Sequence, residues 1–221
     1  MLLAAGKGVR MGELSEHTPK PLIKTNKGMC LIEHHLYALA KAGYEDIVIN
    51  VSHHAEQIKQ ALGNGSKYNV NIQYSEESEP METGGGVFQA LPLLGDEPFV
   101  IISSDVWTDY PIEKLPKKLE ELAYIVLVDN PDHHPLGDFC LLDGNIIESA
   151  ACKLTYSGIG VISPKLFQGC KPVKFSLASL LVKAMQDHQV SGEHYHGTLI
   201  NVNTPEFLDL LHETCKDTPS E

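Results

Sequence analysis

The sequence LAAGKGVRM at residues 3–11 opens the chain with a short apolar run that ends in two small residues and a pair of glycines. A polar segment follows, and HTPKPL at residues 17–22 then places a lysine between two prolines. This order predicts a strand that runs into a backbone turn. Glycine has no Cβ, so the N–H groups of such a turn can approach a phosphate chain closely. Arg10 and Lys20 would supply two positive charges for a polyanion.

A single Gly-x-Gly is weak evidence, because ordinary strand-to-loop turns with surface cations also contain it. The stretch is not a Walker A motif, since no Gly-Lys-Ser/Thr closes it, and it lacks the third glycine of a Rossmann fingerprint. The combination of G-x-G-x-R-M with P-K-P-L at a fixed distance is far more specific. It resembles the signature of the sugar-1-phosphate nucleotidyltransferases, enzymes that join a sugar phosphate to a nucleoside triphosphate.

Composition narrows the class of protein. A chain of 221 residues, 43% of them hydrophobic, can form one large α/β domain with a sizeable core. Its formal net charge of −12 argues against a nucleic-acid partner, which would favour a basic face. No apolar run is long enough to span a bilayer, and the N-terminus lacks the charged region of a signal peptide. Five scattered cysteines without a C-x-x-C pair favour a cytoplasmic location. We expect a monomer or small homo-oligomer.

Eleven histidines invite a zinc hypothesis. The pairs among them are His34-His35, His53-His54, His133-His134 and His194-x-His196. None lies in an H-E-x-x-H motif or beside cysteines with zinc-ligand spacing. Solvated or hydrogen-bonded surface histidines are therefore expected.

Hydrophobic periodicity predicts alternating strands and helices in the first half of the chain. Predicted strands cover residues 1–5, 47–51, 70–74 and 99–103, and predicted helices cover 31–42, 55–62 and a segment from the glycines at 84–86 to 94. This order argues for a parallel sheet with helices on both faces. Ligands gather at the carboxyl ends of such strands. The Gly6 to Arg10 turn and Asp105 both lie at such ends, so we expect them to share one cleft.

In the second half of the chain, predicted strands and helices alternate less regularly. Predicted strands cover 124–128, 139–142, 145–148, 154–162 and 198–202, and predicted helices cover 175–188 and a segment that begins near Pro205. Asp143-Gly144 predicts a hairpin turn. The fold class is α/β, with one domain over 1–221. The nucleotide-binding half is expected over about 1–110 and the sugar-binding half over about 111–215.

Three groups of residues have alternative interpretations. Asp105 ends a buried strand, where a carboxylate can hold Mg²⁺ against triphosphate oxygens, although it is also a plausible turn cap. The segment Glu79–Gly86 suits either the edge of a pyrimidine base or a glycine-rich helix cap. Gly137, Glu148 and Tyr156 lie in segments that suit sugar hydroxyls, as does any polar surface loop.

The resemblance to the sugar-1-phosphate nucleotidyltransferases extends over most of the chain. Six stretches carry it: LAAGKGVRM, HTPKPL, EPMETGGGVFQALPLLGDEPF, DVWTDY, YSGIGV and NVNTPE. DVWTDY and ETGGG favour the bacterial subgroup that joins UTP to N-acetylmuramate 1-phosphate in cell-wall recycling over the glucose and mannose enzymes. The resemblance implies a Rossmann-like GT-A fold with a mixed, mostly parallel sheet, and Mg²⁺-dependent attack of a sugar phosphate on the α-phosphorus.

The resemblance also implies roles for single residues. The nucleotide-binding loop would comprise Ala4, Ala5, Gly6, Gly8 and Arg10. Lys20 matches the lysine that neutralises charge at the α-phosphate, so Arg10, Lys20 and Asp105 would be the catalytic residues.

The remaining assignments concern the base, the sugar and the metal. Glu79 and Gly84 match the segment that reads the base. Asp105 matches the metal aspartate and would also contact substrate, with Gly137, Glu148 and Tyr156 near the sugar phosphate. The second metal position of the family is commonly the aspartate of a D-V-G-T motif, where this chain has Asn201, which offers one neutral oxygen.

Two alternatives remain open. The first is a related nucleotidyltransferase that uses another sugar phosphate or an alcohol phosphate. The second is a catalytically silent nucleotide-binding protein of the same fold, which Asn201 and the short first strand would suit.

Overall fold

The computed structural model describes residues 1–221 except 7, 9–10, 13–16, 27, 150–151 and 215–221. In the described part of the chain, nine strands form one sheet in the order β3-β2-β1-β4-β9-β6-β10-β8-β7. The first four of these in space are parallel: β3 (Asn71–Glu76), β2 (Asp46–Val51), β1 (Leu2–Leu3) and β4 (Phe99–Ser103). This block is the parallel sheet that the apolar runs predict.

The other side of the sheet is mixed. β9 (Thr155–Ile162) lies antiparallel between β4 and β6 (Ala123–Val128), and β10 (Val190–Tyr195) runs parallel to β6. The edge is the hairpin of β7 (Cys140–Leu142) and β8 (Asn145–Ile147), turned by Asp143-Gly144 as predicted. β9 runs antiparallel to both β4 and β6, so β6 runs in the same direction as β4. β6 and β10 therefore end at the same edge of the sheet as β1 to β4.

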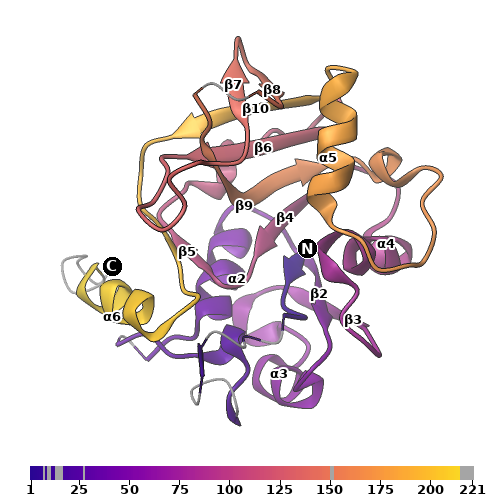
Figure 1. Cartoon of the computed structure of the whole chain (residues 1–221). Coiled ribbons are helices and arrows are strands. Elements are labelled where there is room, and N and C mark those ends of the chain that lie inside the picture. Colours follow the sequence, from indigo (N-terminus) through magenta and orange to yellow (C-terminus); the bar gives the residue numbers. More distant parts are fainter. Residues whose placement is uncertain (7, 9–10, 13–16, 27, 150–151, 215–221) are drawn as a thin grey trace.

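Helices cover both faces of the sheet (Figure 1). The helices are α2 (Leu31–Lys41), α3 (Ala55–Leu62), α4 (Glu82–Leu94), α5 (Leu177–Gln186) and α6 (Pro205–Thr214). Successive residues of β4 point to opposite faces: Ile102 packs into the core with α2 and α3, and Ile101 packs into the core with α4 and α5. A strand buried on both faces reads as a continuous apolar run, which is why the sequence predicted β4 so clearly.

A two-stranded sheet joins the middle of the chain to a segment near its C-terminus. β5 (Val106–Thr108) pairs antiparallel with β11 (Leu199–Asn201). A separate apolar cluster beneath it contains Met11 and Ile23 from the start of the chain and Leu211 from α6. α6 therefore packs close to Met11 and Ile23, which follow β1 in the chain.

The predicted fold class, α/β with a mixed, mostly parallel central sheet, is confirmed. The sequence did not predict two of the strands, β5 and β10. The first strand, predicted over residues 1–5, spans only Leu2–Leu3. Among the described residues, none of the helices has the length and apolar character needed to cross a membrane.

His35 lies on the buried side of α2, so the expectation of a surface histidine is wrong for this residue. Its side chain is only 1% exposed, and its Nε2 lies 2.6 Å from the carbonyl oxygen of Val106. Because a carbonyl only accepts, Nε2 carries the proton and donates it. Burial, with a smaller effect from neighbouring His34, lowers the pKa of His35 to about 3. The histidine thereby anchors β5 to α2 as a neutral donor.

This buried histidine predicts a loss of stability in mild acid. Between pH 6.5 and 3 the unfolded chain binds a proton at His35 that the folded chain excludes, so stability is fully present above pH 6.5 and falls as the pH drops. At about 1.4 kcal/mol per pH unit, the loss from pH 7 to pH 5 is roughly 2 kcal/mol. Urea unfolding at both pH values measures it. His35→Gln retains a donor but cannot titrate, so its pH 7-to-5 loss will be smaller; an equal loss would contradict the account. The exposed His53→Gln serves as control.

Candidate active site

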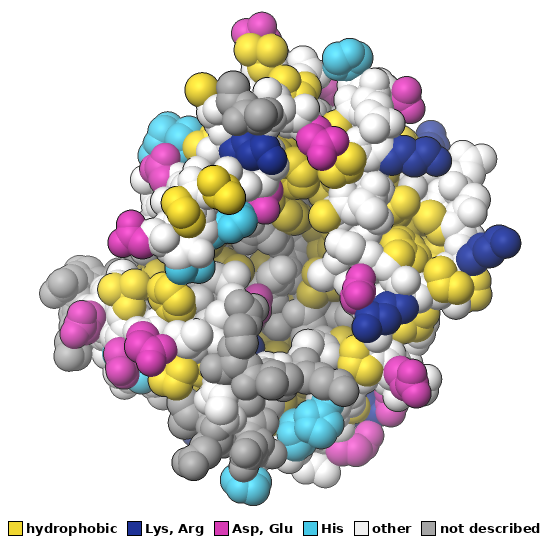
Figure 2. All heavy atoms as spheres, viewed as in Figure 1, with side chains coloured by type: hydrophobic (Ala, Val, Ile, Leu, Met, Phe, Trp, Pro, Cys, Tyr) yellow, Lys and Arg dark blue, Asp and Glu magenta, His cyan; other side chains and the backbone are white. Residues whose placement is uncertain are grey.

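A cavity of about 430 Å³ opens at the carboxyl ends of β1, β2 and β4. Its walls come from residues 3–6 and 8, 20–21, 80–83 except 81, and 103–105, together with Asn50, Glu77 and Asn203. The face in Figure 2 is visibly hollowed at its centre. The two sequence motifs at strand ends, the glycine loop and the segment that closes on Asp105, thus line one cavity, as the topology rule predicts.

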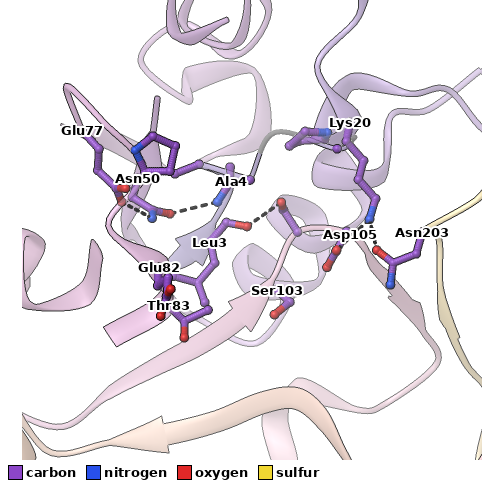
Figure 3. A pocket seen from close by; sticks show the side chains of 16 residues that line it. Leu3, Ala4, Lys20, Asn50, Glu77, Glu82, Thr83, Ser103, Asp105 and Asn203 are labelled. Carbon is purple, nitrogen blue, oxygen red and sulfur yellow. Dashed lines mark hydrogen bonds and ion pairs between the residues drawn. The ribbon is translucent and has the colours of Figure 1, made fainter. Parts of the chain in front are cut away.

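Lys20, Asp105 and Asn203 meet on one side of the cavity (Figure 3). The Nζ of Lys20 lies 2.7 Å from Asp105 Oδ2 and 2.5 Å from Asn203 Oδ1. Lys20 is only 7% exposed. It lies between Pro19 and Pro21 and is the first residue of a 3₁₀ turn, Lys20–Leu22. The prolines restrict the backbone, so the turn holds the ammonium at a defined place in the cavity. The sequence predicted Lys20 and Asp105 as site residues but missed Asn203.

The predicted phosphate loop also lines the cavity. Ala4, Ala5, Gly6 and Gly8 all contribute to its wall. Gly8 has φ of 65°, in the left-handed region that favours glycine, and its carbonyl accepts the N–H of Met11 at 2.8 Å. The predicted phosphate contact Arg10 lies outside the described residues.

A buried polar chain stands on the opposite side of the cavity (Figure 3). The N–H of Ala4 donates to Asn50 Oδ1 at 2.9 Å, and Asn50 Nδ2 donates to Glu77 Oε1 at 2.7 Å. The second oxygen of Glu77 accepts the N–H of Met81 at 2.9 Å. A Cβ on Gly86 would overlap Glu77 Oε1. These hydrogen bonds connect the ends of β1 and β2 to the segment that leads to α4. The sequence did not predict this role for Asn50 and Glu77.

We expect Glu77→Gln to loosen this side of the cavity. An amide offers one oxygen and an NH₂, so it cannot accept from both Asn50 and Met81 in the present geometry. One buried donor left unpaired costs about 1–3 kcal/mol of stability. The KM for a substrate that occupies the cavity should rise more than kcat falls, because Glu77 positions the wall rather than the reacting atoms. Steady-state kinetics and urea unfolding measure both effects. Exposed Glu76→Gln is the matched control and should change stability by less than about 0.5 kcal/mol; equal effects of the two changes would contradict the role.

The predicted base-reading segment divides between two places. Pro80, Glu82 and Thr83 line the cavity. Glu79 lies instead in a neighbouring surface hollow, and Gly84 is buried against the ring of Phe175. The backbone N–H of Gly84 donates to the Phe175 carbonyl at 3.0 Å. Base contacts of Glu79 and Gly84 stay predictions, and Pro80, Glu82 and Thr83 are the members of this segment that line the cavity.

The three predicted sugar residues lie outside this cavity's wall. Tyr156 is partly buried at the start of β9 and its N–H donates to Asp138 Oδ2 at 2.8 Å, Gly137 has φ of 61°, and Glu148 is exposed beyond β8. The start of β9 nevertheless borders the cavity, because a Cβ on Gly158 would lie 2.7 Å from Ser103 Oγ. The sugar contacts therefore stay predictions.

The residues present fit a magnesium ion. Asp105 offers a carboxylate and Asn203 an amide oxygen at the cavity, and Mg²⁺ prefers such oxygen ligands together with phosphates and water. Asn201 Oδ1, the predicted second metal ligand, is buried without a hydrogen-bond partner among the described residues. Its strand is joined to Asp105 by the hydrogen bond from Val202 N–H to the Asp105 carbonyl at 2.8 Å.

The chain resembles known nucleotidyltransferases in sequence. A family profile described as "Nucleotidyl transferase" matches residues 1–139. An N-acetylmuramate alpha-1-phosphate uridylyltransferase of Neisseria meningitidis serogroup B is 41% identical over 216 residues, which cover 92% of each chain. A mannose-1-phosphate guanyltransferase of Hypocrea jecorina is 31% identical over 235 residues, covering 97% of this chain and 63% of that protein.

Solved structures agree on the fold. A putative glucose-1-phosphate thymidylyltransferase from Bacillus anthracis, in complex with a sucrose, superposes with a TM-score of 0.87 at 18% identity, covering 100% of this chain and 96% of that one. The inositol-1-phosphate CTP transferase of T. maritima superposes with a TM-score of 0.77 at 17% identity over 99% and 96% of the two chains. With the profile match, the 41% identical relative and this fold, the chain belongs to the sugar-1-phosphate nucleotidyltransferase family.

Proposed function

We propose that the protein transfers a uridylyl group from UTP to N-acetylmuramate 1-phosphate, giving UDP-N-acetylmuramate and pyrophosphate in peptidoglycan recycling. The observation that carries the proposal is the contact between Lys20 and Asp105, which are 85 residues apart in sequence and meet in a cavity walled by a glycine loop. The choice of UTP and of the muramate sugar rests on the 41% identity to the Neisseria uridylyltransferase. The proposal includes a cytoplasmic location and a monomer or small homo-oligomer.

The proposed chemistry needs positioning and charge neutralisation rather than a strong base. The attacking oxygen of a sugar phosphate is already anionic, and it displaces pyrophosphate in line at the α-phosphorus. The backbone of Ala4, Ala5, Gly6 and Gly8 binds the leaving phosphates, and Lys20 stabilises charge that develops at the α-phosphate. Asp105, with an amide oxygen from Asn201 or Asn203, would hold Mg²⁺, which would supply further neutralisation of the triphosphate charge. The Asn50–Glu77 pair keeps the wall beneath Ala4 in place.

A second candidate is guanylyl transfer to mannose 1-phosphate. The 31% identity to the Hypocrea jecorina enzyme favours it, although this chain spans only 63% of that protein. The two reactions share their chemistry and differ in the base and the sugar. Substrate selectivity therefore decides between them.

A substrate panel tests the proposal. Pyrophosphate release is measured with UTP, CTP or GTP against the 1-phosphates of N-acetylmuramate, glucose and mannose, each with Mg²⁺. We expect kcat/KM for UTP with N-acetylmuramate 1-phosphate to exceed that of any other pair by roughly a hundredfold or more. Pyrophosphate release only with another pair would assign the protein to a related nucleotidyltransferase activity with that nucleotide and sugar phosphate. Binding of UTP without release from any pair would favour a silent nucleotide-binding protein.

A further inference from the structure

Three side chains outside the catalytic cavity offer metal-ligand atoms to one point. One ligand atom from each of Asp129, His194 and His196 lies within 4.8 Å of the others. Nε2 of His194 is 2.9 Å from Asp129 Oδ1, and Nδ1 of His196 is 3.9 Å from Asp129 Oδ2. The two imidazole rings lie close together, with centroids 3.9 Å apart. One carboxylate thus faces two imidazoles.

The topology creates this cluster. β6 and β10 are parallel neighbours in which Val128 pairs with Tyr195, so the next residues, Asp129 and His196, come opposite each other. His194 lies in β10 and His196 directly follows the last residue of that strand. Their ring centroids lie 3.9 Å apart, so both imidazoles are on the same side. The cluster lies at the edge of the sheet where β1 to β4 also end.

Neighbouring residues hold the cluster in place from both sides. Next to Asp129, the side chain of Asn130 donates to the Lys153 carbonyl at 2.8 Å and accepts from Thr155 Oγ1 at 2.8 Å. Between the two histidines, Tyr195 donates its hydroxyl to Asp109 Oδ1 at 2.7 Å. The ligand positions are therefore supported by anchored backbone on both strands, which lowers the cost of ordering them around an ion.

We propose that Asp129, His194 and His196 bind one divalent transition-metal ion, such as Zn²⁺, separately from the magnesium site. Two imidazoles and a carboxylate are a ligand set that suits zinc and its neighbours, whereas Mg²⁺ selects oxygen. Zinc–ligand bonds of about 2.1 Å in a tetrahedron place ligand atoms about 3.4 Å apart, within the range that these side chains span. Side-chain exposure of 74% for Asp129 and 73% for His196 leaves room for that adjustment and for water at the remaining position.

The sequence could not reveal this site. His194-x-His196 alone lacks a zinc motif, and the third ligand, Asp129, precedes His194 by 65 residues. The simpler interpretation is a pair of surface ion pairs between histidine and aspartate. The two interpretations differ in whether a metal ion is retained, since an ion pair alone gives no affinity for zinc.

Equilibrium dialysis with Zn²⁺ in excess Mg²⁺ distinguishes them. We expect one Zn²⁺ per chain at this site, with affinity falling at least about tenfold in His194→Gln and in Asp129→Asn. His134→Gln is the matched control, because His134 also pairs with a single aspartate, Asp138, at 3.1 Å. Equal zinc affinity in the wild type and in His194→Gln, or binding lost only in Cys152→Ser, would overturn the proposal.

Thermal unfolding supplies a second readout that does not depend on activity. An ion that joins β6 to β10 binds only the folded state, so Zn²⁺ should raise the melting temperature of the wild type and of His134→Gln. It should raise that of His194→Gln much less. Each zinc shift is taken against the same protein without zinc, so any stability that His194→Gln loses with its 2.9 Å hydrogen bond to Asp129 does not enter the comparison. An equal zinc shift in all three proteins would contradict the site.

Discussion

Replacing Lys20 with alanine will lower kcat/KM for nucleotidyl transfer by about three orders of magnitude or more, with the fold intact. Lys20 is the described cation that reaches into the cavity, where it lies beside Asp105 and Asn203. In a partly buried site a fixed ammonium stabilises developing negative charge without solvent reorganisation, so its loss falls on the transition state. Pyrophosphate release measures the effect.

Lys24→Ala is the control for Lys20→Ala. Lys24 lies four residues further along and its side chain is exposed. Its removal takes away one positive charge near the site without touching the cavity, and we expect turnover within about twofold of the wild type. Far-ultraviolet circular dichroism and urea unfolding establish that each variant is folded. Unchanged turnover in folded Lys20→Ala would remove the basis for the proposed chemistry.

Replacing Asp105 with asparagine should reduce kcat by a similar factor, about a thousandfold. The side chain keeps its size but loses the charge that attracts a divalent cation and that faces Lys20 at 2.7 Å. Because this carboxylate would hold the proposed ion, the Mg²⁺ concentration for half-maximal rate should rise as well. A Mg²⁺ titration of the initial rate measures both changes.

Asp109→Asn is the matched control in the same DVWTDY stretch. Asp109 accepts the Tyr195 hydroxyl and the Thr198 N–H on one oxygen, at 2.7 and 2.8 Å. It therefore stabilises the connection between β10 and β11, and its replacement should lower stability more than it changes the Mg²⁺ requirement. If Asp109→Asn rather than Asp105→Asn shifted that requirement, the metal assignment would be wrong.

The parallel part of the fold was predictable because its strands carry a complete local signal. β2 and β4 are continuous apolar runs, and α2 and α3 on either side of β2 in the chain are amphipathic. Ligands bind at the carboxyl ends of parallel strands, so the sequence alone predicts that Asp105 and the glycine loop share one cleft. Strong hydrophobic patterning and topology together were enough for this half.

The missed elements depend on distant partners. β5 has three residues and is ordered by pairing with β11, which lies about 90 residues later, and by the buried donor of His35. β10, VSGEHY, carries little apolar signal, and its place beside β6 comes from pairing along its whole length. Local patterns do not contain such information.

The same limit applies to the site. Asn50 stands as a polar residue at the end of an apolar strand, which is a usable signal, but its partner Glu77 lies 27 residues away. Asn203 lies two residues beyond the predicted Asn201, and only the fold shows that Asn203 is the one that contacts Lys20. Position along the motif alone could not distinguish the two.

The most direct test follows the transferred phosphorus. The protein is incubated with UTP labelled with ³²P at the α-phosphate, Mg²⁺ and N-acetylmuramate 1-phosphate, and the products are separated by chromatography. The account predicts that the label moves into UDP-N-acetylmuramate, that it does so only when the sugar phosphate is present, and that Lys20→Ala abolishes the transfer. Label that stays in UTP with the active-site residues intact, or that moves equally well in Lys20→Ala, would contradict the account.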